Sequence, residues 1–295
     1  MQHNKFQNRV EKITQFMSGS RYVTSPLEND ENITDLIQWC NSLPNDCSVS
    51  VGLFGPENLR GLFATKPIQA GDTLCTLNES HILFAALVHP ILETSVEKVK
   101  QVCPVDWAVV QVLPLALLIL LETIEEDVVF HNFAENYIKS YSPYVNTLPK
   151  MSDFESSPNW TSEELELLKN TPLYSETTTR KQQTIEVFEI LAKEFENVWE
   201  FSYDRFVWAI NCCVSRQFGG FDSLNNISEV VLLPLIDMAN NIEVNQDTLP
   251  SITVLQSAAG TFGKFIPLTF FLKFLINSSI PSHSAFGSSE KLRGK

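Results

Sequence analysis

The residues of this chain that could do chemistry together lie between 208 and 241, where WAINCCVSRQFGG leads through an acidic spacer into the apolar run VVLLPLIDMANN. Arg216 lies near the end of the first segment, and Asp237, Asn240 and Asn241 lie at the end of the second. The side-chain amide of an asparagine can donate a hydrogen bond to a carboxylate and accept one from an ammonium group. These polar residues, at the ends of two apolar segments, are the candidates for a binding site.

Two elements would position these polar residues. The segment from Trp208 to Arg216 has the apolar spacing of a helix, with Arg216 following the apolar face. The run from Val230 to Ile236 is apolar throughout, which is typical of a buried strand. The sequence therefore predicts a helix and a strand that carry the polar residues at their ends.

The preceding part of the chain changes from β structure to helices. Alternation and turn residues predict short strands near 50–51, 62–64 and 73–75, which would form a hairpin or a meander. From about 79 to 203 the pattern is helical. A β start, a helical middle and a further strand predict an α+β chain in which a helical insertion interrupts a sheet domain.

Three helical segments are the clearest. NITDLIQWCNSL predicts a helix capped by Asn32 or Thr34. TTTRKQQTIEVFEILAKEFENVWEF predicts a long amphipathic helix. The apolar run WAVVQVLPLALLILL (107–121) contains Gln111 and Pro114 and is shorter than the ~18–20 residues that a bilayer requires. We therefore predict a buried helix here and no membrane span.

Two consecutive motifs resemble the core of the SET-domain methyltransferases: Trp-Ala…Arg, followed by Leu-Pro-Leu-x-Asp-x-x-Asn. The branch that they resemble is typified by Rubisco large-subunit methyltransferase and the actin-histidine methyltransferase. The inserted region adds three ordered matches: YVNTLP (144–149), Trp160 before the Glu/Leu-rich segment 163–168, and TPL (171–173). The resemblance covers 32–241 and implies the SET β-fold with a large helical insertion at about 80–205. It also implies S-adenosylmethionine as cofactor and N-methylation of a lysine or histidine in a non-histone protein. The matched residues of the insertion are expected to be structural.

Within this resemblance, LRGLFATKPIQAGDTL looks like the opening SET motif, in which a glycine-containing turn lets the backbone approach the amino-acid end of the cofactor. Gly61 is kept, whereas Leu59 stands where the family often has a first glycine. The alignment therefore assigns Asn58, Leu59 and Arg60 to cofactor binding.

The second motif supplies the other implied contacts. The resemblance places Arg216 near the cofactor, and the alternative is a surface arginine. Asn240 would bind the carboxylate and ammonium of S-adenosylmethionine. Asn241 occupies the position of the family's histidine and keeps hydrogen-bonding capacity without the ring. Asp237 would either cap the turn or help to bind substrate.

The hydroxyl that aligns the methyl acceptor in the family is missing from its usual place. The family keeps a catalytic tyrosine some tens of residues after its Asn-His pair, and no tyrosine follows Tyr203 here. The segment FGKFIPLTFFLKFLINSSIPS shows neither helical nor strand periodicity, and after Asp247 the chain has five basic residues and one acidic residue. We therefore predict a divergent tail at 249–295, a SET fold that lacks its C-terminal part, and impaired methyl transfer without an assigned catalytic residue.

Composition restricts the partners. A net charge of −14 and a pI near 4.8 argue against nucleic-acid binding and favour a protein or peptide substrate. Six cysteines without a C-x-x-C pair, together with isolated histidines, argue against a metal site. The polar N-terminus is unlike a signal peptide, so we expect reduced thiols in the cytoplasm or nucleus.

The predicted organisation is a flexible N-terminal tail (1–31), a SET domain (32–248) and the divergent tail (249–295). Two other functions stay open: a catalytically inactive SET-like module that binds a partner through its acidic insertion, and a truncated isoform that does not fold stably because its sheet edges are uncovered. The sequence also leaves open whether the acceptor is lysine or histidine, and the oligomeric state.

Overall fold

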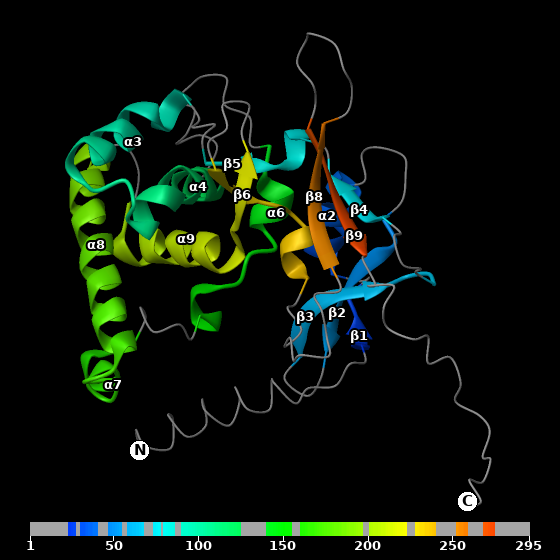
Figure 1. The fold of residues 1–295 in the computed structure, drawn as a ribbon, viewed down its shortest axis with the longest axis horizontal. Coiled ribbons are helices and arrows are strands. Elements are labelled where there is room, and N and C mark those ends of the chain that lie inside the picture. Colours follow the sequence, from blue (N-terminus) through cyan, green and yellow to red (C-terminus); the bar gives the residue numbers. More distant parts are fainter. Residues whose placement is uncertain are drawn as a thin grey trace, which may run out of the picture.

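The computed structural model describes residues 23–27, 30–40, 47–54, 58–67, 73–77, 79–85, 90–124, 140–154, 160–196, 201–222, 228–239, 252–258 and 268–274. The predicted α+β class is confirmed, because helices occupy the middle of the chain and strands lie on both sides of them in sequence. Figure 1 shows α3, α4, α8 and α9 gathered on the left and most of the strands on the right, with α6 between them.

The described strands form three antiparallel sheets of three strands each. Their orders are β1 (Val23–Pro26), β2 (Val49–Phe54), β3 (Leu59–Ala64); β4 (Thr73–Leu77), β9 (Leu268–Phe274), β8 (Ile252–Ala258); and β5 (Leu83–Phe84), β7 (Ser228–Leu232), β6 (Phe218–Asp222). The predicted strands near 50, 62 and 73 are confirmed, and the first two form a hairpin. β1 lies inside the predicted N-terminal tail, so regular structure starts earlier than Asn32.

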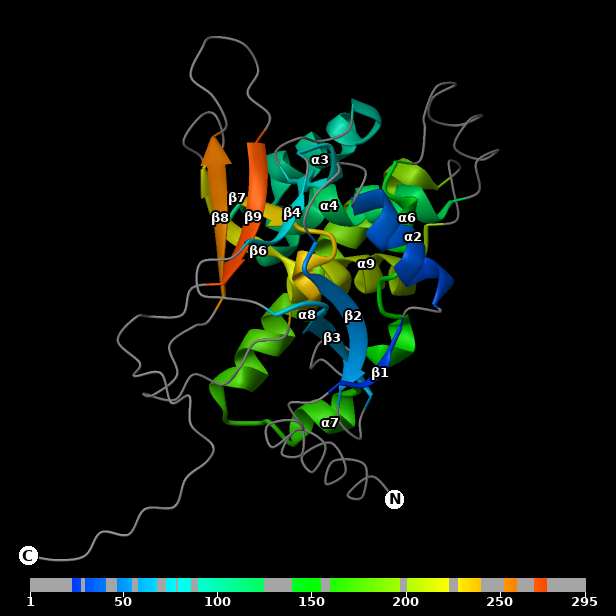
Figure 2. The same cartoon turned by 90° about the vertical axis from the view of Figure 1, so that its right-hand side faces the viewer.

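Two segments of the predicted divergent tail also form strands. β8 and β9 pair with each other, and β9 pairs with β4, so that Phe270 lies opposite Leu77. Figure 2 shows β8 and β9 beside β4, apart from the β1–β2–β3 sheet. The prediction that this region lacks strand character is wrong for these residues. β9 is the central strand of its sheet, and pairing of its backbone along both edges does not require side chains of alternating polarity.

Most of the described helices lie within residues 80–205, the range predicted for the insertion, and the full set runs from α2 to α9. They are α2 (Glu31–Cys40), α3 (Pro90–Val102), α4 (Ala108–Thr123), α6 (Ser142–Val145), α7 (Ser162–Glu166), α8 (Pro172–Phe195) and α9 (Tyr203–Arg216), with short 3-10 turns η1 (Glu79–His81), η2 (Met151–Asp153) and η4 (Ile236–Met238). The cap predicted for α2 is wrong. Asp30 caps this helix, because its Oδ1 accepts a hydrogen bond from the backbone N–H of Ile33 at 3.2 Å.

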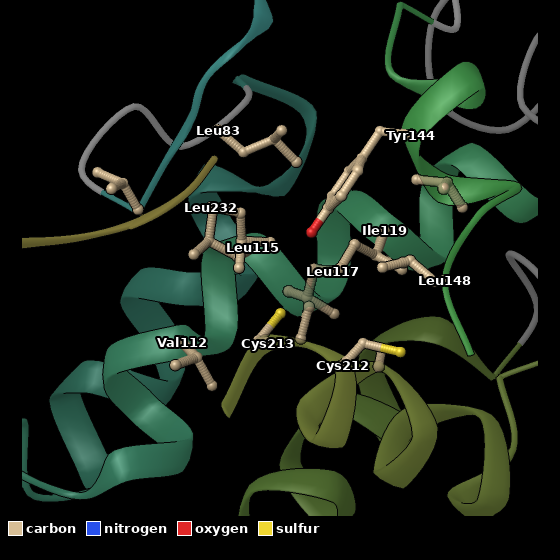
Figure 3. Packing of buried hydrophobic residues seen from close by; sticks show 14 of the residues in the cluster. Leu83, Val112, Leu115, Leu117, Ile119, Tyr144, Leu148, Cys212, Cys213 and Leu232 are labelled. Carbon is tan, nitrogen blue, oxygen red and sulfur yellow. The ribbon is translucent and has the colours of Figure 1, made fainter. Parts of the chain in front are cut away.

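Helix α4 lies at the centre of the core, as the apolar run predicted. Most of its residues are buried, including Pro114, and it packs against α3, α6, α8, α9 and β7. Figure 3 shows Val112, Leu115, Leu117 and Ile119 of α4 facing Cys212 and Cys213 of α9. None of the helices in the described part of the chain combines the length and apolar character that a membrane crossing needs.

The strand that leads to the second motif is shorter than predicted. β7 ends at Leu232, and the chain then turns through Leu235 into η4. Leu235 has φ 68°, in the left-handed region that costs a non-glycine residue about 1–2 kcal/mol. Its side chain is fully buried, so packing holds the turn that presents Asp237.

None of the six cysteines, all of which lie in the described ranges, forms a disulfide, and Cys47 differs from the others in being half-buried. Contact with the Cys75 thiol is the largest effect on the pKa of Cys47 and, against the opposing effect of burial, lowers it to about 7. Burial raises the pKa of Cys212 to about 12 and that of Cys213 well above its ordinary value. Only Cys47 among these three therefore has a substantial thiolate population near neutral pH.

We predict that iodoacetamide modifies Cys47 first in the native protein, because the thiolate is the reactive form. Its rate should fall as the pH decreases below about 7, where the thiolate is protonated, and level off above that pH. Mass spectrometry of the alkylated sites measures this, and Cys47→Ser should remove the fast phase. Equal rates at Cys47 and Cys213 would contradict the prediction.

Candidate functional site

The residues of the candidate site come from four segments that are distant in sequence. Arg60 lies on β3, Tyr144 on α6, Arg216 at the end of α9 and Asp237 on η4. Helix α6 packs against α4, as α9 does, and η4 lies against β3. The buried helix α4 therefore supports two of these segments, and the β2–β3 hairpin supports the other side.

A hydrogen-bonded cluster forms the centre of the site. The Tyr144 hydroxyl donates to Oδ2 of Asp237 at 2.6 Å, and Nη1 of Arg216 donates to the same oxygen at 3.1 Å. The side chain of Asp237 is 0% exposed and that of Arg216 is 14% exposed. A carboxylate removed from water in this way needs charge-assisted hydrogen bonds, and these two donors supply them.

Electrostatics fix the protonation of the two donors. Burial, followed by the nearby charge of Asp237, raises the pKa of Tyr144 well above its ordinary value, so its hydroxyl remains a proton donor. Burial lowers the pKa of Arg216, but Asp237 and Tyr144 outweigh it and the pKa lies above the ordinary value. Asp237 is therefore held by one neutral and one cationic donor.

Arg60 adds a second positive charge. Burial and the charge of Arg216 lower the pKa of Arg60, whereas Asp237 and Asp30 oppose this effect. The charges of Arg60, Arg216 and Asp237 thus act on one another, although the three residues come from separate segments. Two guanidinium groups near one carboxylate make this region suited to a further negative group on a ligand.

Two buried polar atoms of the cluster have no hydrogen-bond partner among the residues that the structure describes: Nε of Arg216 and Oδ1 of Asp237. Buried polar atoms of this kind are rare in folded proteins, and each requires a partner. Nε requires an acceptor and Oδ1 requires a donor. A carboxylate has the chemistry that the first atom requires, and an ammonium group has the chemistry that the second requires.

The structure brings part of the predicted site together. Arg60, Arg216 and Asp237 converge, and the alternative of a surface arginine at position 216 is wrong. Leu59 lies on β3 beside Arg60, and Asn58 is exposed in the preceding turn with φ 52°, a left-handed conformation that asparagine tolerates well. Asn240 and Asn241 lie outside the described residues.

The cap predicted for Asp237 is also wrong. Asp237 lies in the middle of η4, Leu235 is the N-cap of this turn, and Asp237 Oδ2 is directed to Arg216 and Tyr144. The physical reason is that an ion pair with a buried arginine is stronger than a hydrogen bond to a backbone N–H.

Sequence reasoning missed Tyr144. Its YVNTLP segment was expected to be structural, yet its hydroxyl reaches an aspartate 93 residues away. No local pattern predicts this contact, because it depends on how α6 packs against α4. The only available signal was that the segment matches the inserted region of the family.

Metal ligation has no candidate in the described ranges, where no three His, Cys, Asp or Glu side chains are grouped to hold an ion. His81 is buried and its ring lies 4.3 Å from that of Trp39. Burial lowers the pKa of His81, so this residue packs as a neutral ring.

Solved structures of similar fold identify the architecture. A scan against protein-family models gives no match, and a search of curated proteins gives no significant match. The chain is similar to the SET domain of LSMT bound to lysine and AdoHcy (TM-score 0.57, 20% identity, 83% of this chain and 53% of that chain). It is also similar to that domain bound to MeLysine and AdoHcy (0.58, 18%, 83% and 50%) and to Rubisco LSMT bound to AdoMet (0.55, 20%, 83% and 49%).

These similarities show that the chain has the SET-domain fold, as the sequence predicted, with mixed helices and strands. The chain spans about half the length of the structures that it matches. At 20% identity or below, the likeness is one of fold, and activity must be argued from the site.

We predict that Asp237→Ala lowers the free energy of unfolding by about 3–5 kcal/mol, because it leaves the Arg216 charge buried without its carboxylate. Urea denaturation measures this loss. The control Asp106→Ala, at an exposed position, should change the free energy by less than about 0.5 kcal/mol. Equal effects of the two substitutions would show that the cluster does not stabilise the fold.

Proposed function

We propose that this chain binds S-adenosylmethionine and is a protein N-methyltransferase of the SET type whose methyl transfer is impaired. The observation that carries the proposal is the convergence of Arg60 and Arg216, which the sequence resemblance assigned to the cofactor, with Asp237, which it assigned to the turn or to the substrate. Further support comes from the similar SET-fold structures. One of them contains AdoMet, and two contain AdoHcy with either lysine or MeLysine.

The residues of the cluster suit the amino-acid end of this cofactor. Nε of Arg216 is a buried donor for its carboxylate, and Oδ1 of Asp237 is a buried acceptor for its ammonium group. Arg60 adds positive charge that favours the carboxylate. Asn240 and Asn241 remain assigned to the same cofactor by the sequence resemblance, as do Asn58 and Leu59 on the opposite side.

When bound, S-adenosylmethionine supplies a methyl group on a sulfonium, which transfers in line to a nitrogen nucleophile. The protein has to bind the two reactants, align them and exclude water. Arg216 and Asp237 would bind one end of the cofactor in a place that is already largely shielded from solvent. Because Oδ2 of Asp237 is bonded within the protein, we propose contact with the cofactor for this residue in place of the predicted contact with substrate.

Impairment follows from the missing hydroxyl. Tyr144 is fully buried and its hydroxyl is bonded to Asp237, so it does not replace a tyrosine that contacts the methyl acceptor. No tyrosine follows Tyr203, and β9 has phenylalanines at 270 and 271. Alignment of the acceptor nitrogen therefore lacks the hydroxyl that the family uses.

The substrate class follows from charge and from the similar structures. The chain carries a net charge of −14, which favours a basic segment of a protein over a nucleic acid or an anionic membrane surface. The lysine and MeLysine complexes favour a lysine acceptor, with histidine as the alternative. We place the protein in the cytoplasm or nucleus, where free thiols persist.

We predict saturable binding of AdoHcy to the purified chain in calorimetry. Asn240→Ala should weaken it at least tenfold, because hydrogen bonds to charged groups contribute about 1.5–3 kcal/mol each. Asn32→Ala, at an exposed position on α2, is the matched control and should leave binding unchanged. A folded wild-type protein that does not bind AdoHcy would refute the proposal and favour the protein-binding module.

The same preparation tests the impairment. With radiolabelled S-adenosylmethionine and lysine-rich or histidine-containing proteins, we expect incorporation close to the background without enzyme. Multiple turnovers on any of these acceptors would show that the missing tyrosine is dispensable.

A further inference from the structure

We infer that Tyr144 and Asp237 are positioning residues, which hold the Arg216 guanidinium by Nη1 and thereby reserve its Nε–H for the carboxylate of the bound ligand. This inference rests on the proposed function, because the ligand is the proposed cofactor. It assigns a role in the site to the helical insertion, whose residues were expected to be structural.

The first argument is the unusual pairing of Arg216 with Asp237. Arginine and a carboxylate often form two parallel hydrogen bonds, one to each carboxylate oxygen. Here only Nη1 and Oδ2 are joined, at 3.1 Å, while Nε and Oδ1 have no partner in the described part of the chain. The pair therefore leaves one donor and one acceptor unused inside the protein.

The second argument is the position of the Tyr144 hydroxyl. It donates to the same Oδ2 at 2.6 Å, a short hydrogen bond of the strong, charge-assisted kind. This bond fixes the carboxylate in the orientation that offers a single oxygen to Arg216. Without the hydroxyl, the carboxylate is free to turn and form the two-bond pair, which would consume a further N–H of the guanidinium.

The third argument is that Tyr144 is itself held rigidly. Its side chain is fully buried, and the hydroxyl of Thr147 donates to its backbone carbonyl at 2.7 Å. Figure 3 shows its ring beside α4, with the hydroxyl directed towards Leu115 and Leu117. Among the described residues, Asp237 is the hydrogen-bond acceptor of this hydroxyl.

Protonation keeps this arrangement constant. Because the pKa of Tyr144 is raised, its hydroxyl stays protonated throughout the neutral pH range. It therefore donates to Asp237 and adds no second negative charge beside the carboxylate. On the other side of the carboxylate, Leu235 and the short turn η4 fix the backbone of Asp237. The orientation of Arg216 is thus set by α6 and η4. Asp237 is the one proposed cofactor contact on these two segments.

Tyr144→Phe tests the inference, because it removes the hydroxyl and keeps the ring. Two probes are titrated by calorimetry: AdoHcy, and 5′-methylthioadenosine, which lacks the carboxylate and ammonium groups. We expect about tenfold weaker binding of AdoHcy and unchanged binding of 5′-methylthioadenosine. Tyr141→Phe, at a half-buried position immediately before α6, is the matched control and should change neither affinity.

A purely structural role of Tyr144 gives a different result. In that case Tyr144→Phe would weaken the binding of both probes equally, or leave both affinities unchanged. Either result overturns the inference. Binding of AdoHcy to the wild type tests the proposed function separately, since its absence refutes that function before any variant is compared. If Tyr144→Phe does not fold, Thr147→Val replaces it, because it removes the hydroxyl that holds the Tyr144 backbone and touches no proposed ligand contact, and a smaller but equally selective loss of AdoHcy binding is expected.

Discussion

A carboxylate without access to water must be neutralised from within the protein, and the site depends on how Asp237 meets this requirement. Its two donors come from residues 21 and 93 positions away in sequence. The ion pair with Arg216 therefore ties η4 to the end of α9, and the hydrogen bond from Tyr144 ties η4 to α6. Removing either donor leaves charge in a place where water cannot compensate for it.

These two bonds connect α6 of the insertion and the end of α9 to the segment that follows β7. Helix α4 is buried along most of its length and packs against α6 and α9, which carry the two donors. Apolar packing around α4 supplies the stabilisation that offsets the cost of burying the ionic cluster. The left-handed conformation of Leu235 is a second cost that the same packing sustains.

The fold and the chemistry are supported by different observations. The SET fold rests on agreement over 83% of the chain with solved structures at about 20% identity. The proposal of cofactor binding rests on the cluster, where a buried N–H and a buried carboxylate oxygen lack partners in the described residues. The proposed methyl transfer would require in addition a group that aligns the acceptor, and the tyrosine hydroxyl of the cluster is already bonded to Asp237.

The sequence by itself determined the α+β class, the strands near 50, 62 and 73 and the buried helix α4, because periodicity and turn residues are local properties. The candidates Arg60, Arg216 and Asp237 came from the resemblance of short motifs to the SET family. The sequence misjudged the cap of α2, the length of β7 and the strands β8 and β9, whose bounds depend on competing hydrogen bonds and on the partner strand β4. Only the tertiary structure decided that Tyr144 belongs to the site. A contact across 93 residues has no local signature, since it arises when packing around α4 brings two distant backbones together.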